Sequence, residues 1–334
     1  MKRGSVLVLA GFVLLTGAAG AGGRTQVRVG LVLQTTEVDR GSVFERGAFV
    51  GLQQAVKQLG VSAKVVAPNP NQSSFVPTFS YLARQKYDLI IGVGFLAAAD
   101  LAAAASKFPT AKFAILDARQ EDLRGRPKNV RGTLFKAEEA GYLAGYLAAL
   151  MEKRRPGKDV VSTVGGYKIP TVDAYIAGYQ AGARKADPGI ATLNGYSADF
   201  VVTEKCKTLA LDQIARGSGV VFAVAGPCGL GALAAAKEKG VWGVGVDIDQ
   251  SYLGPHILTS AVKRLDVAVY DLVRSLVRGT LTTGGNFVFD LRNGGVGLAR
   301  ISPKVPSSFL AQVERIRRQI VAGKISVPST LGKR

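Results

Sequence analysis

Two aspartates each end an apolar run of the sequence. Asp117 closes the run 112–117, and Asp247 closes the run 241–247. A carboxylate at the end of a buried strand can accept hydrogen bonds from the hydroxyl or N–H groups of a ligand. The same position suits the N-cap of a helix, so either aspartate alone fits both interpretations. Two carboxylates at matching positions favour a ligand site.

Aromatic residues and a glycine-rich turn also fall near expected strand ends. Phe44, Phe95 and Phe222 lie there, and an aromatic ring at such a place can stack on a planar ligand, although a single phenylalanine is more often a core residue. The turn Gly226–Gly231 lies between a strand-like and a helix-like segment. Its glycine spacing departs from the dinucleotide-binding pattern, and Pro227 removes an N–H donor. A secreted NAD-type enzyme is therefore only a minor alternative.

Catalytic chemistry has little support in the sequence. The single histidine, His256, follows a Gly-Pro pair without a partnered nucleophile, and the sequence contains no Walker A lysine, G-x-S-x-G or H-E-x-x-H motif. Two cysteines and one histidine are too few for a zinc cluster. We expect a protein that is not an enzyme and that uses no cofactor and no metal.

The first residues have the pattern of a secretory signal peptide. Lys2 and Arg3 precede an almost wholly apolar stretch, Ser5–Thr16, and small residues follow as far as Ala21. The apolar stretch is shorter than the roughly 20 residues that span a bilayer, which disfavours the alternative of a membrane anchor. We expect a signal peptide over residues 1–21, cleaved after Ala21. Because no cysteine lies near this site, we expect export to the periplasm or cell surface without lipoprotein attachment.

The expected export bears on the redox state of the two cysteines. Cys206 and Cys228 both lie in the part of the chain that remains after cleavage. In an oxidising compartment two thiols favour one disulfide. The alternative is two buried, reduced thiols, and the sequence does not give the distance between them.

The composition fits a globular protein with a strongly basic surface. The 334 residues are 47% hydrophobic and 20% charged, which disfavours disorder and coiled coil. Lys and Arg number 43 against 24 Asp and Glu, giving a formal charge of +19. The basic residues are scattered, and no basic stripe interleaves with aromatics as a nucleic-acid groove requires. We interpret the charge as a solvated surface and expect no nucleic-acid partner.

Strand-like and helix-like segments alternate along the chain. The strand-like runs are apolar, as expected for strands buried on both faces of a parallel sheet; they are 27–33, 63–67, 87–94, 112–117, 160–165, 219–225 and 241–247. Helix-like stretches separate them, at 44–59, 96–107, 138–151, 171–185 and 230–239. The alternation predicts doubly wound α/β architecture, and the strands are too many for one ordinary sheet. In such folds ligands bind at the carboxyl ends of the strands.

A series of short stretches carries a family resemblance. In order along the chain they are Ile91–Phe95, Phe113–Asp117, Glu139–Gly145, Val164–Gly166, Val221–Gly226, Gly243–Gln250 and Ile257–Asp266. Together they resemble the basic membrane protein (BMP/PnrA-like) family, substrate-binding components of bacterial ABC transporters, several of which bind purine nucleosides. The resemblance implies a type I periplasmic-binding-protein fold. Such a fold has two doubly wound parallel-sheet lobes, hinge crossings and an interlobe ligand cleft.

The resemblance also implies roles for single residues. Phe44 and Phe222 would sandwich the base, and Asp117 would bind the polar edge of the ligand. Asp247 and Lys263 would hold the ribose hydroxyls.

The chain departs from the family at one place. The family commonly has Ser-Phe-Asn where this chain has Val43-Phe44-Glu45, so Glu45 is the candidate to replace the polar contact. Gly226 completes the predicted ligand-binding residues. Asp249 is the alternative to Asp247, because both carboxylates lie in one motif.

These observations predict an extracytoplasmic, monomeric solute-binding protein. It would deliver a purine nucleoside of the guanosine, inosine or adenosine type to the permease of an ABC importer. We expect an N-terminal lobe formed by 24–133 plus 263–291 and a C-terminal lobe formed by 134–262 plus 292–325. The main alternative within the binding class is recognition of a sugar or another small metabolite.

Overall fold

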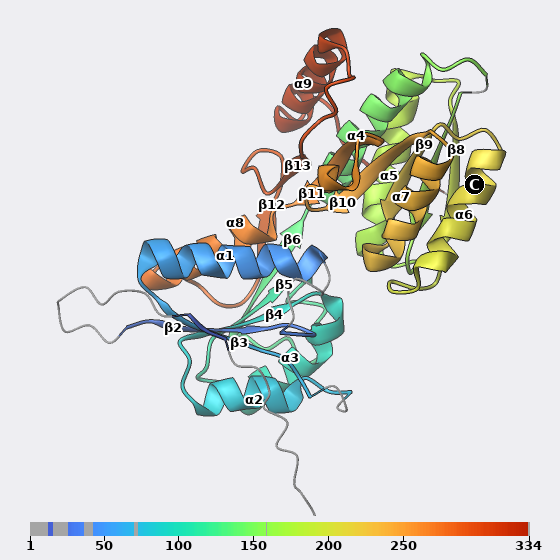
Figure 1. Ribbon diagram of the computed structural model, residues 1–334. Helices are drawn as coiled ribbons and strands as arrows, with labels where there is room; N and C mark the ends of the chain where they lie inside the picture. Colours follow the sequence, from blue (N-terminus) through green and yellow to red (C-terminus); the bar gives the residue numbers. More distant parts are fainter. Residues whose placement is uncertain (1–12, 16–25, 37–42, 70–72, 158, 333–334) are drawn as a thin grey trace, which may run out of the picture. The chain divides into compact units, whose positions relative to one another are not determined.

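The computed structural model describes residues 13–15, 26–36, 43–69, 73–157 and 159–332 (Figure 1). This part of the chain forms two compact units. The first unit consists of the described strands before helix α1 (Val43–Leu59), of Ala48–Leu134 and of Asp266–Phe287. The second takes the start of α1 as far as Gly47, Phe135–Leu265 and the chain from Val288 onward. Residues 43–47, 263–265 and 288–291, expected in the N-terminal lobe, group with the second unit, and Leu134, expected in the C-terminal lobe, groups with the first.

The first unit is built on a sheet with strand order β1-β3-β2-β4-β5-β6-β12. The strands β2 to β6 pair in parallel, whereas β1 runs antiparallel to β3. Their bounds are β1 Val13–Leu15, β2 Arg28–Val32, β3 Ser62–Val66, β4 Leu89–Val93, β5 Phe113–Leu116, β6 Val130–Phe135 and β12 Asn286–Phe289. The central strands β4 and β5 are buried along their whole length, because helices cover both faces of the sheet.

Two helices lie on each face of this sheet. Figure 1 shows α1 (Val43–Leu59) and α8 (Leu265–Val277) on one face, and α2 (Val76–Arg84) and α3 (Phe95–Lys107) on the other. The alanine-rich α3 packs closely on the sheet because its small side chains need little space. A Cβ atom at Gly51 of α1 would collide with the backbone of α8.

The second unit is built on a sheet with strand order β13-β11-β10-β9-β7-β8. All neighbouring strands run parallel except β13, which is antiparallel to β11. The bounds are β7 Val160–Gly165, β8 Ala191–Tyr196, β9 Val220–Val224, β10 Trp242–Asp247, β11 Ile257–Lys263 and β13 Val296–Leu298. The whole described chain is therefore α/β with two mostly parallel sheets, as predicted.

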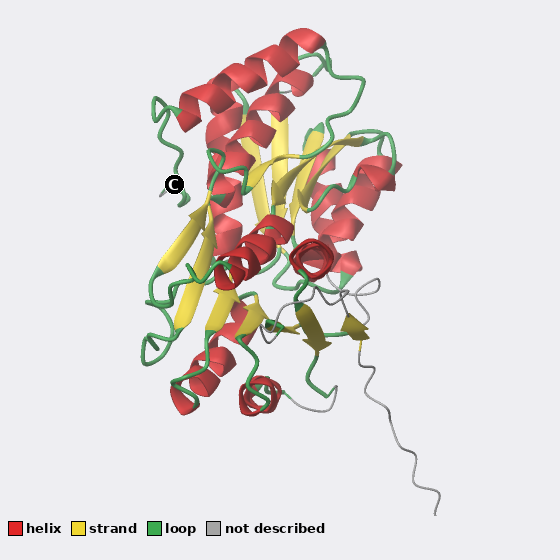
Figure 2. Cartoon of the chain, turned by 90° about the vertical axis from the view of Figure 1, so that its left-hand side faces the viewer, coloured by secondary structure: helices red, strands yellow, loops and turns green. Residues whose placement is uncertain are grey.

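Helices also cover both faces of the second sheet (Figures 1 and 2). One pair is α4 (Ala137–Glu152) with α5 (Pro170–Ala186), and the other is α6 (Thr203–Ala215) with α7 (Gly229–Glu238). The helix α9 (Ser307–Val321) packs against α4. Two short 3₁₀ helices, η1 (Gly226–Cys228) and η2 (Ser251–Leu253), follow β9 and β10.

Glycines let α4 and α5 approach each other closely. A Cβ atom at Gly141 or Gly145 of α4 would collide with the backbone of α5. Conversely, a Cβ atom at Gly178 or Gly182 of α5 would collide with the backbone of α4. This reciprocal packing fixes α5, which carries an aromatic residue of the site described below.

The expected signal peptide falls mostly outside the described residues. Only Val13–Leu15 of this segment is described, as the edge strand β1. The cleavage site after Ala21 lies outside the described residues, so the signal peptide stays a prediction. None of the helices in the described part of the chain has the length and apolar character needed to cross a bilayer.

Candidate functional site

Asp247 and Lys263 lie at the same edge of the second sheet. Asp247 is the last residue of β10, and in the parallel ladder with β11 it pairs with Val262. Lys263 is the next residue and ends β11. The carboxyl ends of two adjacent strands thus bring an acid and a base to neighbouring positions. The Lys263 residue is only 5% exposed.

Two aromatic rings surround the Lys263 ammonium. Its Nζ lies 5.1 Å from the ring centre of Tyr175, on α5, and 5.8 Å from that of Phe44, on α1. Both distances fit a cation–π interaction, which helps to hold a cation away from bulk water. The Tyr175 hydroxyl lies 3.5 Å from Asp247 Oδ1 and 3.3 Å from the Ala261 carbonyl, either of which can accept its single proton. Tyr175 therefore contacts both charged groups.

The backbone at the two strand-end aspartates is unusual. Asp117 has φ = 60° and Asp247 has φ = 65°, in the left-handed region that few non-glycine residues adopt. Neither caps a helix: Asp117 is followed by turns, and the N-cap of η2 is Gln250. The N-cap interpretation is therefore wrong for both. Strained backbone of this kind is commonly retained at functional sites.

A buried amide fixes the turn after Asp247. The side-chain Oε1 of Gln250 accepts the N–H of Val246 at 2.8 Å, and the backbone N–H of Gln250 donates to Ser260 Oγ at 3.0 Å. Gly245 leaves the space for this side chain, because a Cβ atom there would lie 2.6 Å from Gln250 Oε1. The sequence contained no periodic signal for this positioning residue. The neighbouring Asp249 is exposed and accepts the N–H of Ser251, so it acts locally and Asp247 is the better site candidate.

The positive charge of Lys263 also acts on a second carboxylate, that of Glu138. Burial raises the pKa of Glu138, in the first turn of α4, while the positive charges of Lys136 and Lys263 act in the opposite direction. Next to it, Glu139 accepts the N–H of Leu291 at 2.8 Å and pairs with Lys136 at 3.2 Å. The amino end of α4 is thus tied to the chain that follows β12.

Phe222 lies in the core and not on a surface that a ligand can reach. It is the middle residue of β9 and is 0% exposed. The Tyr175 ring meets it edge-on at 5.8 Å between centroids, and the Tyr179 ring lies 5.1 Å away. This position corrects the expected sandwich, because a fully covered ring has no free face to stack on a base.

A partly exposed aromatic residue, Phe200, lies near the predicted site residue Gly226. It lies in the loop Ser197–Val202, between β8 and α6. A Cβ atom at Gly166 would collide with its ring, and a Cβ atom at Gly226 would lie 3.7 Å from the same ring. Tyr167 meets the ring edge-on at 5.1 Å. Phe200 therefore lies at the carboxyl ends of β7 and β9, next to the predicted site residue Gly226.

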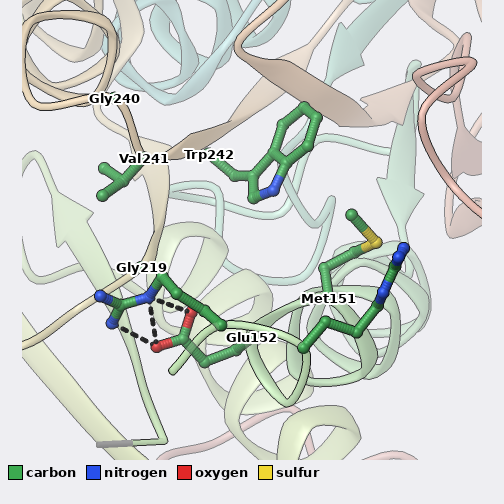
Figure 3. A pocket seen from close by; sticks show the side chains of 8 residues that line it. Met151, Glu152, Gly219, Gly240, Val241 and Trp242 are labelled. Carbon is green, nitrogen blue, oxygen red and sulfur yellow. Dashed lines mark hydrogen bonds and ion pairs between the residues drawn. The ribbon is translucent and has the colours of Figure 1, made fainter. Parts of the chain in front are cut away.

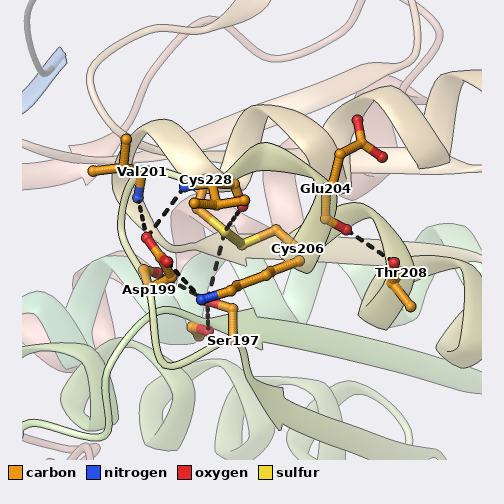
Figure 4. The surroundings of a disulfide bond; sticks show 10 residues. Ser197, Asp199, Val201, Glu204, Cys206, Thr208 and Cys228 are labelled. Atoms are coloured by element: carbon orange, nitrogen blue, oxygen red, sulfur yellow. Dashed lines mark hydrogen bonds and ion pairs between the residues drawn. A yellow bond between two sulfur atoms is a disulfide. The ribbon is translucent and has the colours of Figure 1, made fainter.

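The Phe200 loop (Ser197–Val202) is fixed by polar contacts and by a disulfide (Figure 4). Asp199 accepts the N–H groups of Val201 and Val202 at 2.8 and 3.1 Å and pairs with Lys205 at 2.8 Å. These contacts lower the pKa of Asp199 to about 2, and the Lys205 ammonium has a larger effect than the two N–H groups. The structure joins Cys206 and Cys228 in a disulfide, with 5.6 Å between their Cα atoms.

The remaining predicted residues lie on other elements. Glu45, in the first turn of α1 beside Phe44, is 3% exposed. Asp117 directly follows β5 of the first unit. Phe44, Gly226, Asp247 and Lys263 all belong to the second unit.

A cavity of about 230 Å³ lies at the opposite edge of the second sheet (Figure 3). Trp242 and Gly219, at the amino ends of β10 and β9, contribute to its wall. The buried Glu152 carboxylate there is paired with Arg155 at 2.6 Å. None of the predicted ligand residues lines this cavity.

Comparisons with known proteins agree on one family. The Bmp model, described as ABC transporter substrate-binding protein PnrA-like, matches residues 28–330. Basic membrane protein B of Borrelia garinii is 33% identical over 261 residues, covering 77% of this chain and 74% of that protein. The ABC transporter nucleoside-binding protein BmpA of Lactococcus lactis is 28% identical over 353 residues, covering 97% of each.

Solved structures share the fold. An ABC transporter solute-binding protein from Aeropyrum pernix K1 has a TM-score of 0.77 and 25% identity, covering 92% of this chain and 94% of that one. A periplasmic solute-binding protein from Actinobacillus succinogenes with bound D-allose has a TM-score of 0.62 at 16% identity, covering 82% and 97%. The fold is thus that of the periplasmic binding proteins of ABC transporters.

These findings place the protein in the class of extracytoplasmic solute-binding proteins of ABC transporters. Within that class, the chain belongs to the Bmp family of PnrA-like ABC transporter substrate-binding proteins. The predicted family is confirmed, and membership implies a membrane permease as partner. A relative from Pyrococcus horikoshii, 31% identical over 318 residues, is called a lipoprotein.

Proposed function

We propose that the chain binds a purine nucleoside and delivers it to the permease of an ABC importer. The observation that carries this proposal is the group formed by Asp247, Lys263, Tyr175 and Phe44 at one edge of the second sheet. It combines a carboxylate acceptor, an ammonium donor and aromatic surface. The relative from Lactococcus lactis that is called nucleoside-binding supports the same ligand class.

Each part of a nucleoside has a matching group here. The ribose hydroxyls can donate to the Asp247 carboxylate and accept from the Lys263 ammonium, in charge-assisted hydrogen bonds. The flat base can stack on Phe44 and on Phe200, which replaces Phe222 in this proposal. Glu45 and Asp117 stay predicted contacts to the polar edge of the base.

Binding measurements test the ligand directly. Guanosine, inosine or adenosine should raise the melting temperature of the purified protein, because a ligand selective for the native state stabilises it. Isothermal calorimetry should show one site for at least one of the three. A free hexose serves as the control, and heat with the hexose but with none of the nucleosides would replace this function by sugar binding.

Export and a monomeric state complete the proposal. N-terminal sequencing of the protein recovered from outside the cytoplasmic membrane should begin after Ala21. A chain that still carries residues 1–21 would refute the predicted cleavage. Sedimentation analysis should give the mass of one chain, and a dimer at working concentration would refute the monomer.

A further inference from the structure

The Phe200 loop is attached to its surroundings at both sides of the aromatic residue. At its start, the N–H groups of Ser197 and Ala198 donate to the carbonyls of Gly165 and Gly166, at 2.9 and 3.2 Å. At Phe200 itself, the carbonyl accepts the N–H of Cys228 at 2.9 Å. The backbone of Phe200 is therefore held by a residue that takes part in the disulfide.

The disulfide joins the two segments that flank the Phe200 ring. Cys206 lies in the first turn of α6, directly after the loop. Cys228 ends η1, the short helix that begins at Gly226, and both sulfur-bearing residues are fully buried. Figure 4 shows Cys228 between Cys206 and the loop residues Ser197 and Asp199, and its Sγ lies 3.5 Å from Ser197 Oγ.

We propose that the Cys206–Cys228 disulfide positions Phe200 for the ligand base, an inference that rests on the proposed function. A ligand that binds a mobile loop must order it, and this cost weakens binding. The covalent bond orders the loop beforehand, because it fixes η1 against α6 and η1 in turn holds the Phe200 carbonyl.

A purely structural role is the competing explanation. The helices α6 and α7 already pack tightly without the bond, since a Cβ atom at Gly231 would collide with the carbonyl of Thr203. A bond that only strengthens this packing would change stability and leave the affinity of the folded protein unchanged. The two explanations therefore differ in binding and not in melting temperature.

The test compares the wild type with the double variant Cys206→Ala/Cys228→Ala. We expect the dissociation constants of guanosine and of free guanine to rise by the same factor, about 3- to 10-fold, which corresponds to the ordering of one or two side chains. The equal loss reflects a contact to the base and not to the ribose. In a Phe200→Ala background, removal of the disulfide should leave both constants unchanged, because the positioned ring is gone.

Amide exchange gives a readout that needs no ligand. The N–H of residue 228, which donates to the Phe200 carbonyl, should exchange at least about 10-fold faster in the double variant, because local opening becomes easier. Unchanged affinity, unchanged exchange, or the same affinity loss in the Phe200→Ala background would each overturn the proposal.

Two further outcomes are also decisive. Cys206→Val/Cys228→Ala serves as a second variant that refills the buried volume, and failure of both variants to fold would overturn the proposal in favour of a folding role. If the wild type binds no nucleoside, the proposed function fails, and the exchange rate at residue 228 alone decides the positioning.

Discussion

Replacing Lys263 by methionine tests the core of the proposed site. Methionine keeps the length and apolar character of the side chain and removes the ammonium. In the free protein the substitution loses a cation–π interaction with Tyr175 and Phe44, worth roughly 0.5–2 kcal/mol. It also removes the cost of burying a charge, which offsets part of that loss. We therefore expect a folded variant whose free energy of unfolding changes by no more than about 2 kcal/mol.

Binding should change much more than folding. A hydrogen bond from a charged donor contributes about 1.5–3 kcal/mol, so loss of the Lys263 contact to ribose should weaken guanosine about 10- to 150-fold. Free guanine has no ribose and should lose much less. Calorimetric titration of both ligands into the same protein preparation measures the difference.

A matched substitution provides the control. Lys239, at the end of α7, is half exposed and pairs with its neighbour Glu238 at 3.2 Å. Lys239→Met should leave both affinities unchanged. Equal losses for guanosine and guanine in the Lys263→Met protein would refute the ribose contact and show that Lys263 acts through the structure of the strand end.

Three other predictions concern the roles of residues in and near the proposed site. Phe200→Ala should weaken nucleoside binding by about 1–3 kcal/mol, whereas Phe222→Ala should lower the free energy of unfolding by about 3–5 kcal/mol and leave the affinity unchanged, as calorimetry and denaturant unfolding will show. Asp247→Asn should weaken guanosine while Asp249→Asn should not, and the reverse order in titration would exchange their roles. The pKa of Asp199 is lowered from 3.8 to about 2. The ionised carboxylate therefore stabilises the folded protein fully above about pH 4, and this stabilisation is lost as the pH falls toward 2. Asp199→Asn should remove this part of the pH dependence of the melting temperature.

The fold could be predicted because its central strands are strongly apolar. Strands such as β4, β5 and β9 are buried along their whole length, and their sequences contain little but apolar residues. Asp247 and Lys263 end adjacent strands, because a loop and one strand return the chain to the same edge of a parallel sheet. Where the hydrophobic signal is strong, sequence reasoning locates the strand ends and thus the polar residues on them.

Phe200 was missed because the strand before it gives no such signal. β8 is an edge strand whose residues are all at least partly exposed, and it includes Asn194 and Gly195. Without an apolar run the segment did not look like a strand, so Phe200 did not look like a strand-end residue. The role of Phe222 came from the family resemblance, and the burial of its ring in the middle of β9 excludes that ring from the ligand.

Tyr175 illustrates a different limit. The stretch 171–185 was predicted to be helical, and Tyr175 lies on the buried face of the helix that the structure shows there. Periodicity gives the face of a helix but not the partner of a hydroxyl group, which depends on how closely α5 approaches the sheet. The position of α5 is set by close glycine contacts with α4. These contacts join two separate helices, so the pattern of one helix does not reveal them.

The groups at the carboxyl edge of the second sheet share one structural origin. Asp247 ends β10 and Gly226 begins the short helix after β9, and both residues have left-handed backbone, with φ of 65° and 53°. Side chains from neighbouring elements then fill the space beside them: Phe200 next to Gly226, and Tyr175 next to Asp247. Strand register and Gln250 fix the position of Asp247, and the disulfide is proposed to do the same for Phe200. Because a site assembled in this way has little left to order, its affinity should depend more on which groups line it than on how far they must move.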